Sequence, residues 1–89
     1  MAPKFSIVVP TRNRSATLRH TLRTCLDQTF GDFEVVVTDN FSDDDTREVV
    51  AALNDPRIKY VRTDAYISMS RNFANGLKHA SGEALIFIG

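Results

Sequence analysis

The chain has 89 residues, in which eleven basic and eleven acidic side chains cancel to a net charge of zero. This length fits one small domain with a modest core. No basic run or stripe stands out, so there is no electrostatic case for binding nucleic acid or a membrane surface. No signal-peptide pattern and no apolar run of about 20 residues occurs, and we therefore expect these residues to be soluble.

The first strand is expected at residues 5–9, where the sequence FSIVV is apolar and rich in β-branched side chains. Pro10 is expected to close this strand, because proline has no N–H to donate to a neighbouring strand. In the polar turn that follows, Asn13 or Ser15 has the side chain needed to cap a helix.

An amphipathic helix is predicted next. Its apolar residues recur at helical spacing, at Leu18, Leu22, Cys25 and Leu26. The helix is expected to end near Thr29, with Gly31 as the break. Cys25 is the only cysteine, which excludes an internal disulfide and fits a reducing, cytoplasmic compartment. Its place on the apolar stripe favours a buried structural thiol over a nucleophile.

The β-branched run at residues 35–37 predicts a fully buried second strand, which delivers Asp39 to a sheet edge. Ser42 and, three residues later, Asp45 form a start signal similar to a capping box. The aspartates at 43–45 suit the positive end of a helix dipole. A second helix is therefore expected through Val49, Val50 and Leu53.

A turn at residues 54–56 leads to a third strand at 58–62, whose lysine and arginine favour a place near the sheet edge. After a loop at 63–67, a third helix is indicated by Met69, Phe73 and Leu77, and it is expected to stop at Ser81-Gly82. The last expected strand is the apolar run at 84–88.

This alternation predicts an α/β fold, a Rossmann-like three-layer sandwich with a mainly parallel four-stranded sheet in the order β-α-β-α-β-α-β. Residues 1–89 contain no repeat and no linker, so we expect a single domain. Because the last strand is very apolar and ends at a terminal glycine, these residues are expected to be the front part of a longer domain.

The carboxyl ends of parallel strands share one edge of a sheet, where ligands of open α/β sheets bind. This edge gathers residues 11–14, residues 39–45 and whatever follows Gly89. Asp39 has a carboxylate that can accept from ribose hydroxyls or a base N–H, and the arginines of the first turn can meet phosphates. For residues 43–45, complementation of the helix dipole is favoured over ligand contact.

Several familiar site motifs are absent from the sequence. No glycine-rich dinucleotide or P-loop motif follows the first strand, and no H-E-x-x-H, paired C-x-x-C or G-x-S-x-G occurs. His20 and His79 have no partner at metal-ligand spacing, so both are interpreted as ordinary surface histidines.

Three segments in order along the chain carry a resemblance to a known family: SIVVPTRNR from Ser6, EVVVTDNFSDDDT from Glu34, and SRNFANGLKHASGEALIFIG from Ser70. Together they resemble the N-terminal nucleotide-binding half of a family 2 glycosyltransferase with the GT-A fold. The resemblance covers nearly the whole chain.

The resemblance implies a nucleotide pocket. The turn at 10–13 would line it, Asp39 would hydrogen-bond the base, and Ser42 with Asp44 would form the family's Ser-x-Asp element. An Arg-Asn pair in the third helix would lie near the nucleotide or its diphosphate. The nucleotide-binding residues implied in this way are Pro10, Thr11, Arg12, Asn13, Asp39, Ser42, Arg71 and Asn72.

The residues by themselves leave structural roles open. Thr11 and Asn13 could be turn and cap residues, Arg71 a solvated helix arginine, and Asn72 a hydrogen-bond partner of a neighbouring loop. The chain also departs from the family, which commonly has Asp-Asp-Gly-Ser where Asp39-Asn40-Phe41-Ser42 stands here.

The family's Asp-x-Asp motif normally follows the fourth strand, so this chain is expected to be truncated just before it. In the family that motif holds Mg²⁺ or Mn²⁺ on the diphosphate oxygens. No catalytic residue and no metal ligand is therefore expected within residues 1–89, and none of these residues alone is expected to bind a metal.

The function implied by the resemblance is that of a fragment of an inverting, metal-dependent glycosyltransferase, of hexosyltransferase type. The donor would be a nucleoside-diphosphate sugar with its base left open. The acceptor would be a hydroxyl of an unidentified saccharide, lipid or protein, at the cytoplasm or the cytoplasmic face of a membrane. The 89-residue chain alone is expected to be inactive.

Two alternatives of other classes remain. A flavodoxin-like phosphoacceptor module would use the aspartate cluster with Mg²⁺. Such a module requires a carboxylate at the end of the third strand and a lysine after a later strand, whereas the third strand here ends in Arg62-Thr63-Asp64 and no matching later lysine follows. A non-catalytic interaction module would associate through exposed sheet edges or apolar patches, including self-association of the fragment.

Overall fold

The computed structural model describes residues 3–27 and 32–87, which form alternating strands and helices. In chain order these are β1 (Phe5–Thr11), α1 (Ser15–Leu26), β2 (Phe33–Asp39), α2 (Thr46–Leu53), β3 (Ile58–Arg62), α3 (Met69–His79) and β4 (Ala84–Phe87). The predicted α/β alternation is confirmed. No helix in this described part is long and apolar enough to cross a membrane.

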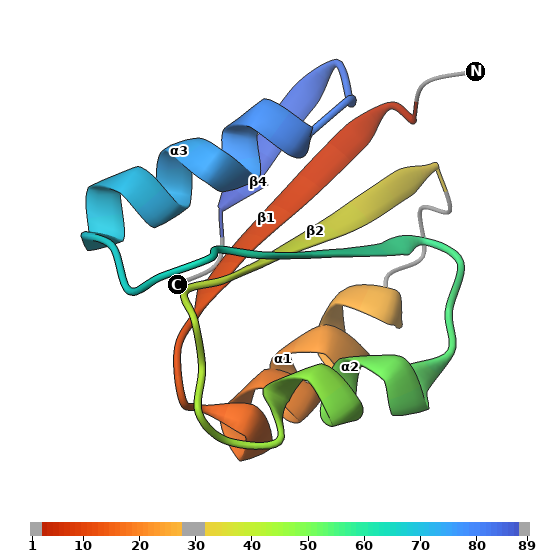
Figure 1. Ribbon diagram of the computed structural model, residues 1–89. Helices are drawn as coiled ribbons and strands as arrows, with labels where there is room; N and C mark the ends of the chain where they lie inside the picture. Colours follow the sequence, from red (N-terminus) through yellow and green to blue (C-terminus); the bar gives the residue numbers. More distant parts are fainter. Residues whose placement is uncertain (1–2, 28–31, 88–89) are drawn as a thin grey trace.

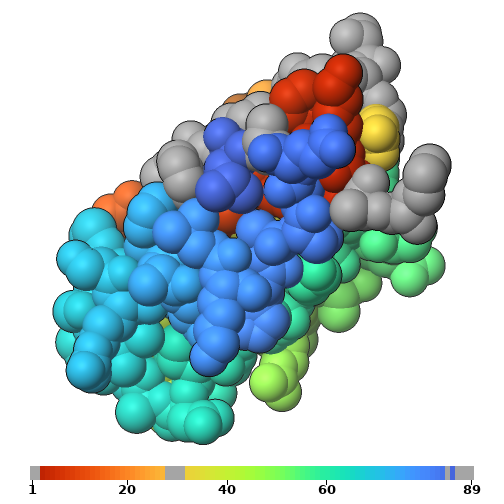
Figure 2. Space-filling view, turned by 90° about the horizontal axis from the view of Figure 1, so that it is seen from above, coloured from red at the N-terminus to blue at the C-terminus, as the bar shows by residue number. Residues whose placement is uncertain are grey.

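The strands form one four-stranded sheet in the order β3-β2-β1-β4, and every pairing is parallel. The predicted edge position of β3 is therefore confirmed. Figure 1 shows three layers, with α1 and α2 on one face of the sheet and α3 on the other. In Figure 2 the molecule is seen from the α3 side, where the helix and the segment before it spread over the sheet.

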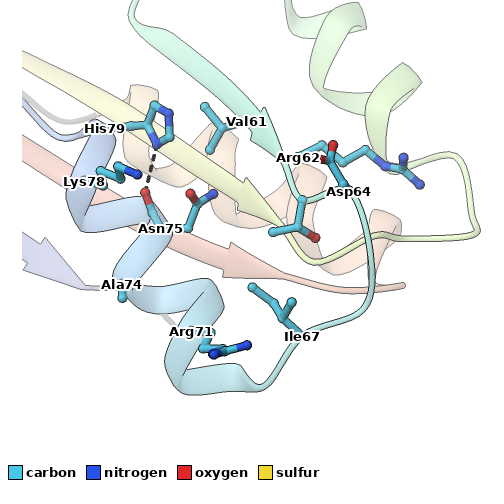
Figure 3. A pocket seen from close by; sticks show the side chains of 10 residues that line it. Val61, Arg62, Asp64, Ile67, Arg71, Ala74, Asn75, Lys78 and His79 are labelled. Atoms are coloured by element: carbon cyan, nitrogen blue, oxygen red, sulfur yellow. Dashed lines mark hydrogen bonds between the residues drawn. The ribbon is translucent and has the colours of Figure 1, made fainter.

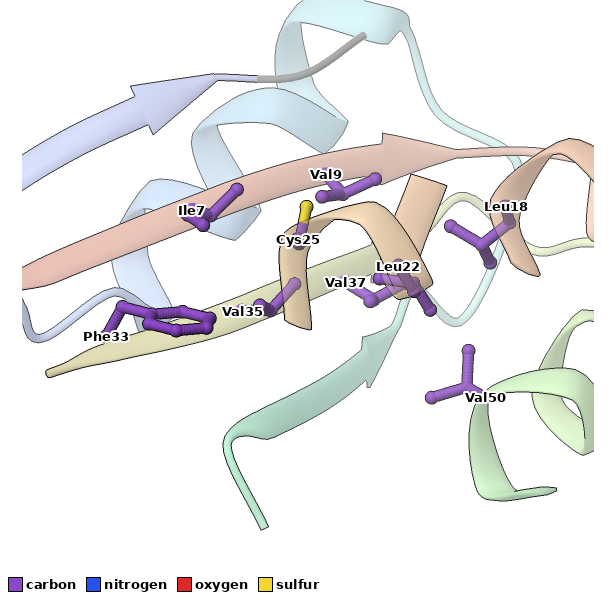
Figure 4. Packing of buried hydrophobic residues seen from close by; sticks show 9 residues of the cluster. All are labelled: Ile7, Val9, Leu18, Leu22, Cys25, Phe33, Val35, Val37 and Val50. Carbon is purple, nitrogen blue, oxygen red and sulfur yellow. The ribbon is translucent and has the colours of Figure 1, made fainter. Parts of the chain in front are cut away.

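The main core lies between the sheet and α1 and α2. Alternate side chains of β1 and β2 point to this face, as the period of two in a strand requires. They meet one side of α1 and a single valine of α2 (Figure 4). The cluster comprises Ile7, Val9, Leu18, Leu22, Cys25, Phe33, Val35, Val37 and Val50. Cys25 is 1% exposed, and burial raises the pKa of its thiol, which confirms the predicted structural role.

On the opposite face, α3 comes very close to the sheet at one glycine. A Cβ atom placed on Gly76 would lie 2.7 Å from Cγ1 of Val8 and 2.9 Å from Cγ2 of Thr38. The helix can therefore reach this depth only without a side chain at position 76.

Near the amino ends of the strands, the buried carboxylate of Glu34 links β2 to neighbouring segments. Glu34 accepts from the Ser6 hydroxyl at 2.6 Å and from the Ser81 N–H at 2.7 Å, and Lys59 Nζ lies 3.2 Å away. The Ser6 oxygen in turn accepts from the Gly82 N–H at 2.7 Å. Burial favours the protonated acid, but the hydrogen bonds from Ser6 and Ser81 outweigh it and lower the pKa of Glu34 to about 2.

The expectation that Pro10 closes the first strand is wrong, because β1 continues through Pro10 to Thr11. The carbonyl of Thr11 accepts from Asn40 N–H on the β2 side. Neighbouring residues of a strand direct their backbone groups to opposite sides, so the nitrogen of Pro10 faces away from β2. On that side the pairing with β4 is described as far as Val8.

The expected helix caps are also corrected. Arg14 and Asp45 are the residues at the N-caps of α1 and α2, and neither supplies a side-chain cap. Instead one carboxylate, that of Asp44, accepts from the Ser15 N–H at 3.2 Å and from the Thr46 N–H at 3.1 Å. The capping-box interpretation of Ser42 and Asp45 is therefore wrong, since a residue between them serves the first turns of both helices.

Two helix ends also differ from expectation. α1 ends at Leu26, and the predicted end near Thr29 and the break at Gly31 lie outside the described residues. α3 ends at His79 with Ala80 as its C-cap, slightly before the expected stop at Ser81-Gly82.

Candidate functional site

The loops that follow β1, β2 and β3 meet at one edge of the sheet, on the left of Figure 1. We call this edge the rim and define it as residues 12–14, 40–45 and 63–68. The strand ends beneath it are in register, because Thr11 pairs with Asp39 and Asp39 pairs with Arg62. The topology thus brings together the two loops that the sequence singled out, and it adds a third.

Asp39 lies at the centre of the rim and is only 1% exposed. Its Oδ1 accepts from the backbone N–H of Ser42 at 3.1 Å and from the Ser42 hydroxyl at 2.6 Å. Its Oδ2 accepts from the Tyr60 hydroxyl, and Arg62 Nε lies 3.9 Å away. Burial and then this hydrogen bond raise the pKa of Tyr60 to about 12. Both oxygens of the predicted base-binding carboxylate therefore contact protein groups.

Asn13 and Ser42 join the first two loops of the rim. The Asn13 N–H donates to the Ser42 hydroxyl oxygen at 2.9 Å, and Asn13 Oδ1 accepts from the Asp43 N–H at 2.7 Å. Asn13 also has a positive φ of 50°, which asparagine tolerates better than most residues. Both side chains thus hold loop geometry, in agreement with the structural role left open for Asn13.

Arg12 binds the second loop from the first. Its Nη1 donates to the carbonyls of Asn40 at 2.9 Å and Phe41 at 2.6 Å. Its guanidinium also stacks on the ring of Tyr66, with 4.5 Å from its central carbon to the ring centroid. Arg12 is therefore a link among all three loops, and a third of its side chain stays exposed.

Phe41 stands where the family commonly has glycine, and its φ is 54°. This left-handed conformation explains why glycine suits the position. Here the Arg62 guanidinium packs on the Phe41 ring at 4.5 Å, and its Nη2 donates to the Ser42 carbonyl at 3.0 Å. Cation–π packing and a hydrogen bond thus hold the loop in a backbone conformation that its own residue disfavours.

Asn72 in α3 is 3% exposed and faces the sheet. Its Oδ1 accepts from the Thr38 hydroxyl at 2.9 Å, and its Nδ2 donates to the Thr38 carbonyl at 3.0 Å. Both halves of this amide therefore fix α3 to the end of β2. The side chain thus has a structural contact, but its partner is the strand β2 and not the neighbouring loop that the sequence left open.

Arg71 points away from the sheet and is exposed. It lines an open groove of about 700 Å³ between β3 and α3, shown in Figure 3. The groove is lined by Val61, Arg62, Thr63, Asp64, Ile67, Arg71, Ala74, Asn75, Lys78 and His79. Its basic groups outnumber its one carboxylate, so the groove suits an anionic ligand.

Pro10 and Thr11 lie at the end of β1 below the rim, Pro10 partly exposed and Thr11 8% exposed. The structure thus places six of the eight predicted residues at or beneath the first two loops of the rim. The other two, Arg71 and Asn72, are consecutive residues in the first turn of α3, of which Asn72 is buried and Arg71 exposed.

Within the described residues, no group of three or more histidine, cysteine, aspartate or glutamate side chains could hold a metal ion. The acidic run at 43–45 does not serve this purpose, because Asp44 directs both oxygens to backbone N–H groups. Its hydrogen bonds, foremost the one from the Thr46 hydroxyl, lower the pKa of Asp44. The residues described here do not fit a metal centre.

The sequence predicted a loop at 63–67, but not that this loop joins the rim or which residues hold it there. Asn40 Nδ2 donates to the Ile67 carbonyl at 2.7 Å, and Asn40 Oδ1 accepts from the Ile67 N–H at 2.9 Å. Tyr60 and Arg62 reach Asp39 from β3. For Arg62 the sequence did contain a signal. A basic residue at the end of one parallel strand can lie in register with an acidic residue at the end of the neighbouring strand.

Comparison with known proteins bears on this arrangement. The model of the family described as "Glycosyl transferase family 2" matches residues 6–89. A Campylobacter jejuni protein, GalNAc(5)-diNAcBac-PP-undecaprenol beta-1,3-glucosyltransferase, is 42% identical over 97% of this chain, which spans 29% of that protein. A validoxylamine A glucosyltransferase of Streptomyces hygroscopicus subsp. jinggangensis is 44% identical over 97% of this chain, which spans 21% of it.

Solved structures share the fold. A mannosyltransferase from Pyrobaculum calidifontis in complex with GDP-Man and Mn²⁺ has a TM-score of 0.84 and 26% identity, covering 96% of this chain and 26% of its own. S. aureus TarS 1–349 in complex with UDP-GlcNAc has a TM-score of 0.83 and 30% identity, with the same coverage. The chain thus spans about a quarter of the proteins to which it is similar.

Proposed function

The chain belongs to glycosyl transferase family 2, and from this premise we propose that it is the nucleotide-binding part of a longer glycosyltransferase. The complete enzyme would move a hexose from a nucleoside-diphosphate sugar to an acceptor hydroxyl. The family match covers the sheet and its loops, and the similar proteins above carry glycosyltransferase names.

The observation that carries the proposal is the convergence of three separate loops at the end of β2, where Asp39 lies. Ligands of open α/β sheets bind at this edge. Arg71 is exposed beside it and can pair with a diphosphate, since a guanidinium matches phosphate geometry. Solved relatives of this fold were obtained with GDP-Man and with UDP-GlcNAc, and we extend that ligand class to this chain.

The predicted residues divide into two groups in this proposal. Arg71 and the exposed part of Arg12 contact the ligand, and the buried side chains of Ser42 and Asn72 shape its seat. A base that hydrogen-bonds Asp39 must first displace the Tyr60 hydroxyl from Oδ2. Binding should therefore release Tyr60, which gives the proposal a spectroscopic signature.

In the complete enzyme, a carboxylate outside these 89 residues would deprotonate the acceptor hydroxyl, which attacks the anomeric carbon as the nucleoside diphosphate leaves. We propose a divalent ion, Mg²⁺ or Mn²⁺, held by residues other than those described here. When bound, such an ion stabilises negative charge on the diphosphate. The acceptor and the base of the donor stay open in this proposal.

The place of action is also a proposal. The name of the Campylobacter jejuni relative specifies an undecaprenol-linked substrate. We propose that the complete protein works in the cytoplasm, at the cytoplasmic face of a membrane.

The test is a titration of the 89-residue chain with UDP, TDP and GDP, with and without Mg²⁺, followed by amide chemical shifts. We expect selective shifts at Thr11, Asp39 and Arg71, together with a change in the ring signals of Tyr60. Arg71→Gln should weaken binding, whereas Arg19→Gln, at an exposed position of α1, should leave it nearly unchanged. A dispersed spectrum that no nucleoside diphosphate perturbs would contradict the proposal.

A second measurement concerns turnover. The 89-residue chain should transfer no sugar from any nucleotide-sugar donor, because no described residue group provides the metal site. A protein extended to the length of the family members should do so with a suitable acceptor. Turnover by the 89-residue chain would contradict the proposal that the catalytic carboxylate and the metal ligands lie outside these residues.

A further inference from the structure

Tyr66 is the aromatic side chain that stands out from the rim. It is 67% exposed, whereas Phe41 on the neighbouring loop is covered by Arg62. A single exposed aromatic residue is common on protein surfaces and indicates nothing by itself. What distinguishes Tyr66 is how firmly its surroundings hold it.

The ring of Tyr66 is held from one side by a fixed cation. Arg12 stacks on it at 4.5 Å, and the same guanidinium donates to two backbone carbonyls of the second loop. The Arg12 guanidinium is therefore held in place by the second loop, and its contact restrains the ring of Tyr66. One face of Tyr66 is occupied by Arg12, and the exposed area lies on the remainder of the ring.

The backbone beside Tyr66 is held as well. Asn40, 5% exposed, forms two hydrogen bonds with the backbone of Ile67, at 2.7 and 2.9 Å. On the other side, the Thr63 hydroxyl donates to the Ala65 carbonyl at 2.9 Å. These bonds restrain the backbone on both sides of Tyr66, so less backbone entropy is lost when a ligand packs on the ring.

Tyr66 and Arg71 are parts of one short, restrained segment. Ser68 is the N-cap of α3. Its hydroxyl accepts from the Arg71 N–H at 3.2 Å, which fixes the first turn of the helix relative to the loop. The segment thus presents a ring with one open face and, five residues later, an exposed guanidinium. A nucleotide has the matching pair of groups, a planar base and a charged diphosphate.

We propose that Tyr66 is a specificity-determining residue that stacks on the base of the nucleotide, while Arg71 pairs with the diphosphate. This inference rests on the proposed function and adds to it the group that separates a nucleotide from other diphosphates. Stacking is tolerant of base identity, because every base has a π-face. Tyr66 therefore selects for a nucleoside and leaves the choice of base to hydrogen bonds elsewhere.

The test compares UDP or GDP with inorganic diphosphate as ligands of the 89-residue chain, by calorimetry. Tyr66→Ala should weaken the binding of UDP or GDP between about fivefold and a hundredfold. It should leave the affinity for inorganic diphosphate unchanged. Tyr66→Phe should bind the nucleotides like the unmodified chain, and Met69→Ala, at an even more exposed position, serves as the matched control.

A second readout is independent of affinity. The sequence has only two tyrosines, so the ring protons of Tyr66 can be assigned against those of Tyr60. The ring of Tyr66 should show an upfield ring-current shift with UDP or GDP, and none with inorganic diphosphate.

The possible outcomes separate this inference from the proposed function. If Arg71→Gln loses nucleotide binding and Tyr66→Ala retains it in full, the inference is wrong and the proposed function stands. Equal losses of UDP and inorganic diphosphate in Tyr66→Ala would show that Tyr66 merely positions the loop, and would also overturn it. If the unmodified chain binds neither ligand, both proposals fail.

Discussion

Glu34 shows at the scale of one residue how a buried charge can support a fold. Its carboxylate meets donors from Ser6, Ser81 and Lys59, which come from three different segments. A charge in this position is favourable only while every partner is present, because desolvation opposes it. This role was not predictable from the sequence, in which Glu34 is simply a charged residue next to a β-branched run.

Acid should destabilise the protein through Glu34. Its pKa falls from about 4.5 in the unfolded chain to about 2 in the folded one, so the unfolded state binds the proton more readily. The stabilisation is complete above pH 4.5 and is lost as the pH falls towards 2. We expect Glu34→Gln to cost about 2–3 kcal/mol at pH 7, measured by urea unfolding.

The same comparison has a built-in control. The difference between Glu34→Gln and the unmodified chain should shrink as the pH falls through 2, because below this pH both carry a neutral side chain at position 34. Glu83→Gln removes an exposed carboxylate and should change stability by less than about 0.5 kcal/mol. A penalty for Glu34→Gln that is constant from pH 7 to pH 2 would exclude a contribution from the charge.

Residue roles at the rim were predicted with mixed success. Position was predictable, because strand ends of a parallel sheet must share an edge, and this brings Thr11 near Asp39. Orientation was not, because it depends on contacts distant in sequence. Asn72 turns inward to Thr38 while the adjacent Arg71 points outward, and no local pattern separates the two.

At the scale of elements, Gly76 sets the distance between α3 and the sheet. Gly76→Ala would normally stabilise a helix by about 1 kcal/mol. Here the added Cβ would collide with Val8 and Thr38, so we expect a net loss of about 1–3 kcal/mol, measured by urea unfolding. Ser70→Ala, at an exposed position of the same helix, should not destabilise the protein. Equal stabilisation by both changes would mean that α3 does not pack this closely.

Asp44 should contribute to two helices at once. Asp44→Ala removes the acceptor of the first N–H of α1 and of α2, and each lost cap costs about 1 kcal/mol. We expect a loss of about 2 kcal/mol in thermal or urea unfolding. Asp43→Ala, which lacks these contacts to the helix ends, should cost far less. A penalty of equal size for the two would indicate general charge effects.

Elements were predicted better than their ends. Apolar runs and helical spacing located the described strands and helices, because burial leaves a pattern in the sequence. They indicated the wrong face of α3, since Met69 is 82% exposed and the buried residues of that helix are Asn72 and Gly76. The ends depend on single hydrogen bonds between loops, such as Asp44 with Ser15, across 29 positions. Pro10 was misjudged for a similar reason, since its effect depends on which side of β1 has a neighbour.

At the scale of the whole molecule, the sheet formed by the described residues has unpaired outer edges on β3 and β4. Leu85 of β4 is 45% exposed, so an apolar side chain lies beside one of these edges. We predict that the isolated chain self-associates at high concentration, because open edges and apolar surface promote pairing. Light scattering across a concentration series measures this.

The control for association is a charged edge. Leu85→Lys should lower the association measured by light scattering without unfolding the chain, since charged side chains discourage edge pairing. A clean monomer at millimolar concentration would contradict the prediction. Association unaffected by Leu85→Lys would place the contact on another surface.

The order of the sheet also has a consequence for synthesis. β1 is made before the other described strands, yet it is a central strand, and its partner β4 is the last of those strands to be made. β1, β2 and β3 can pair early, but one side of β1 must wait while residues up to Phe87 emerge. Such distant pairing slows folding and leaves a template for wrong partners. The growing chain is therefore most vulnerable to aggregation in the interval between completing β3 and completing β4.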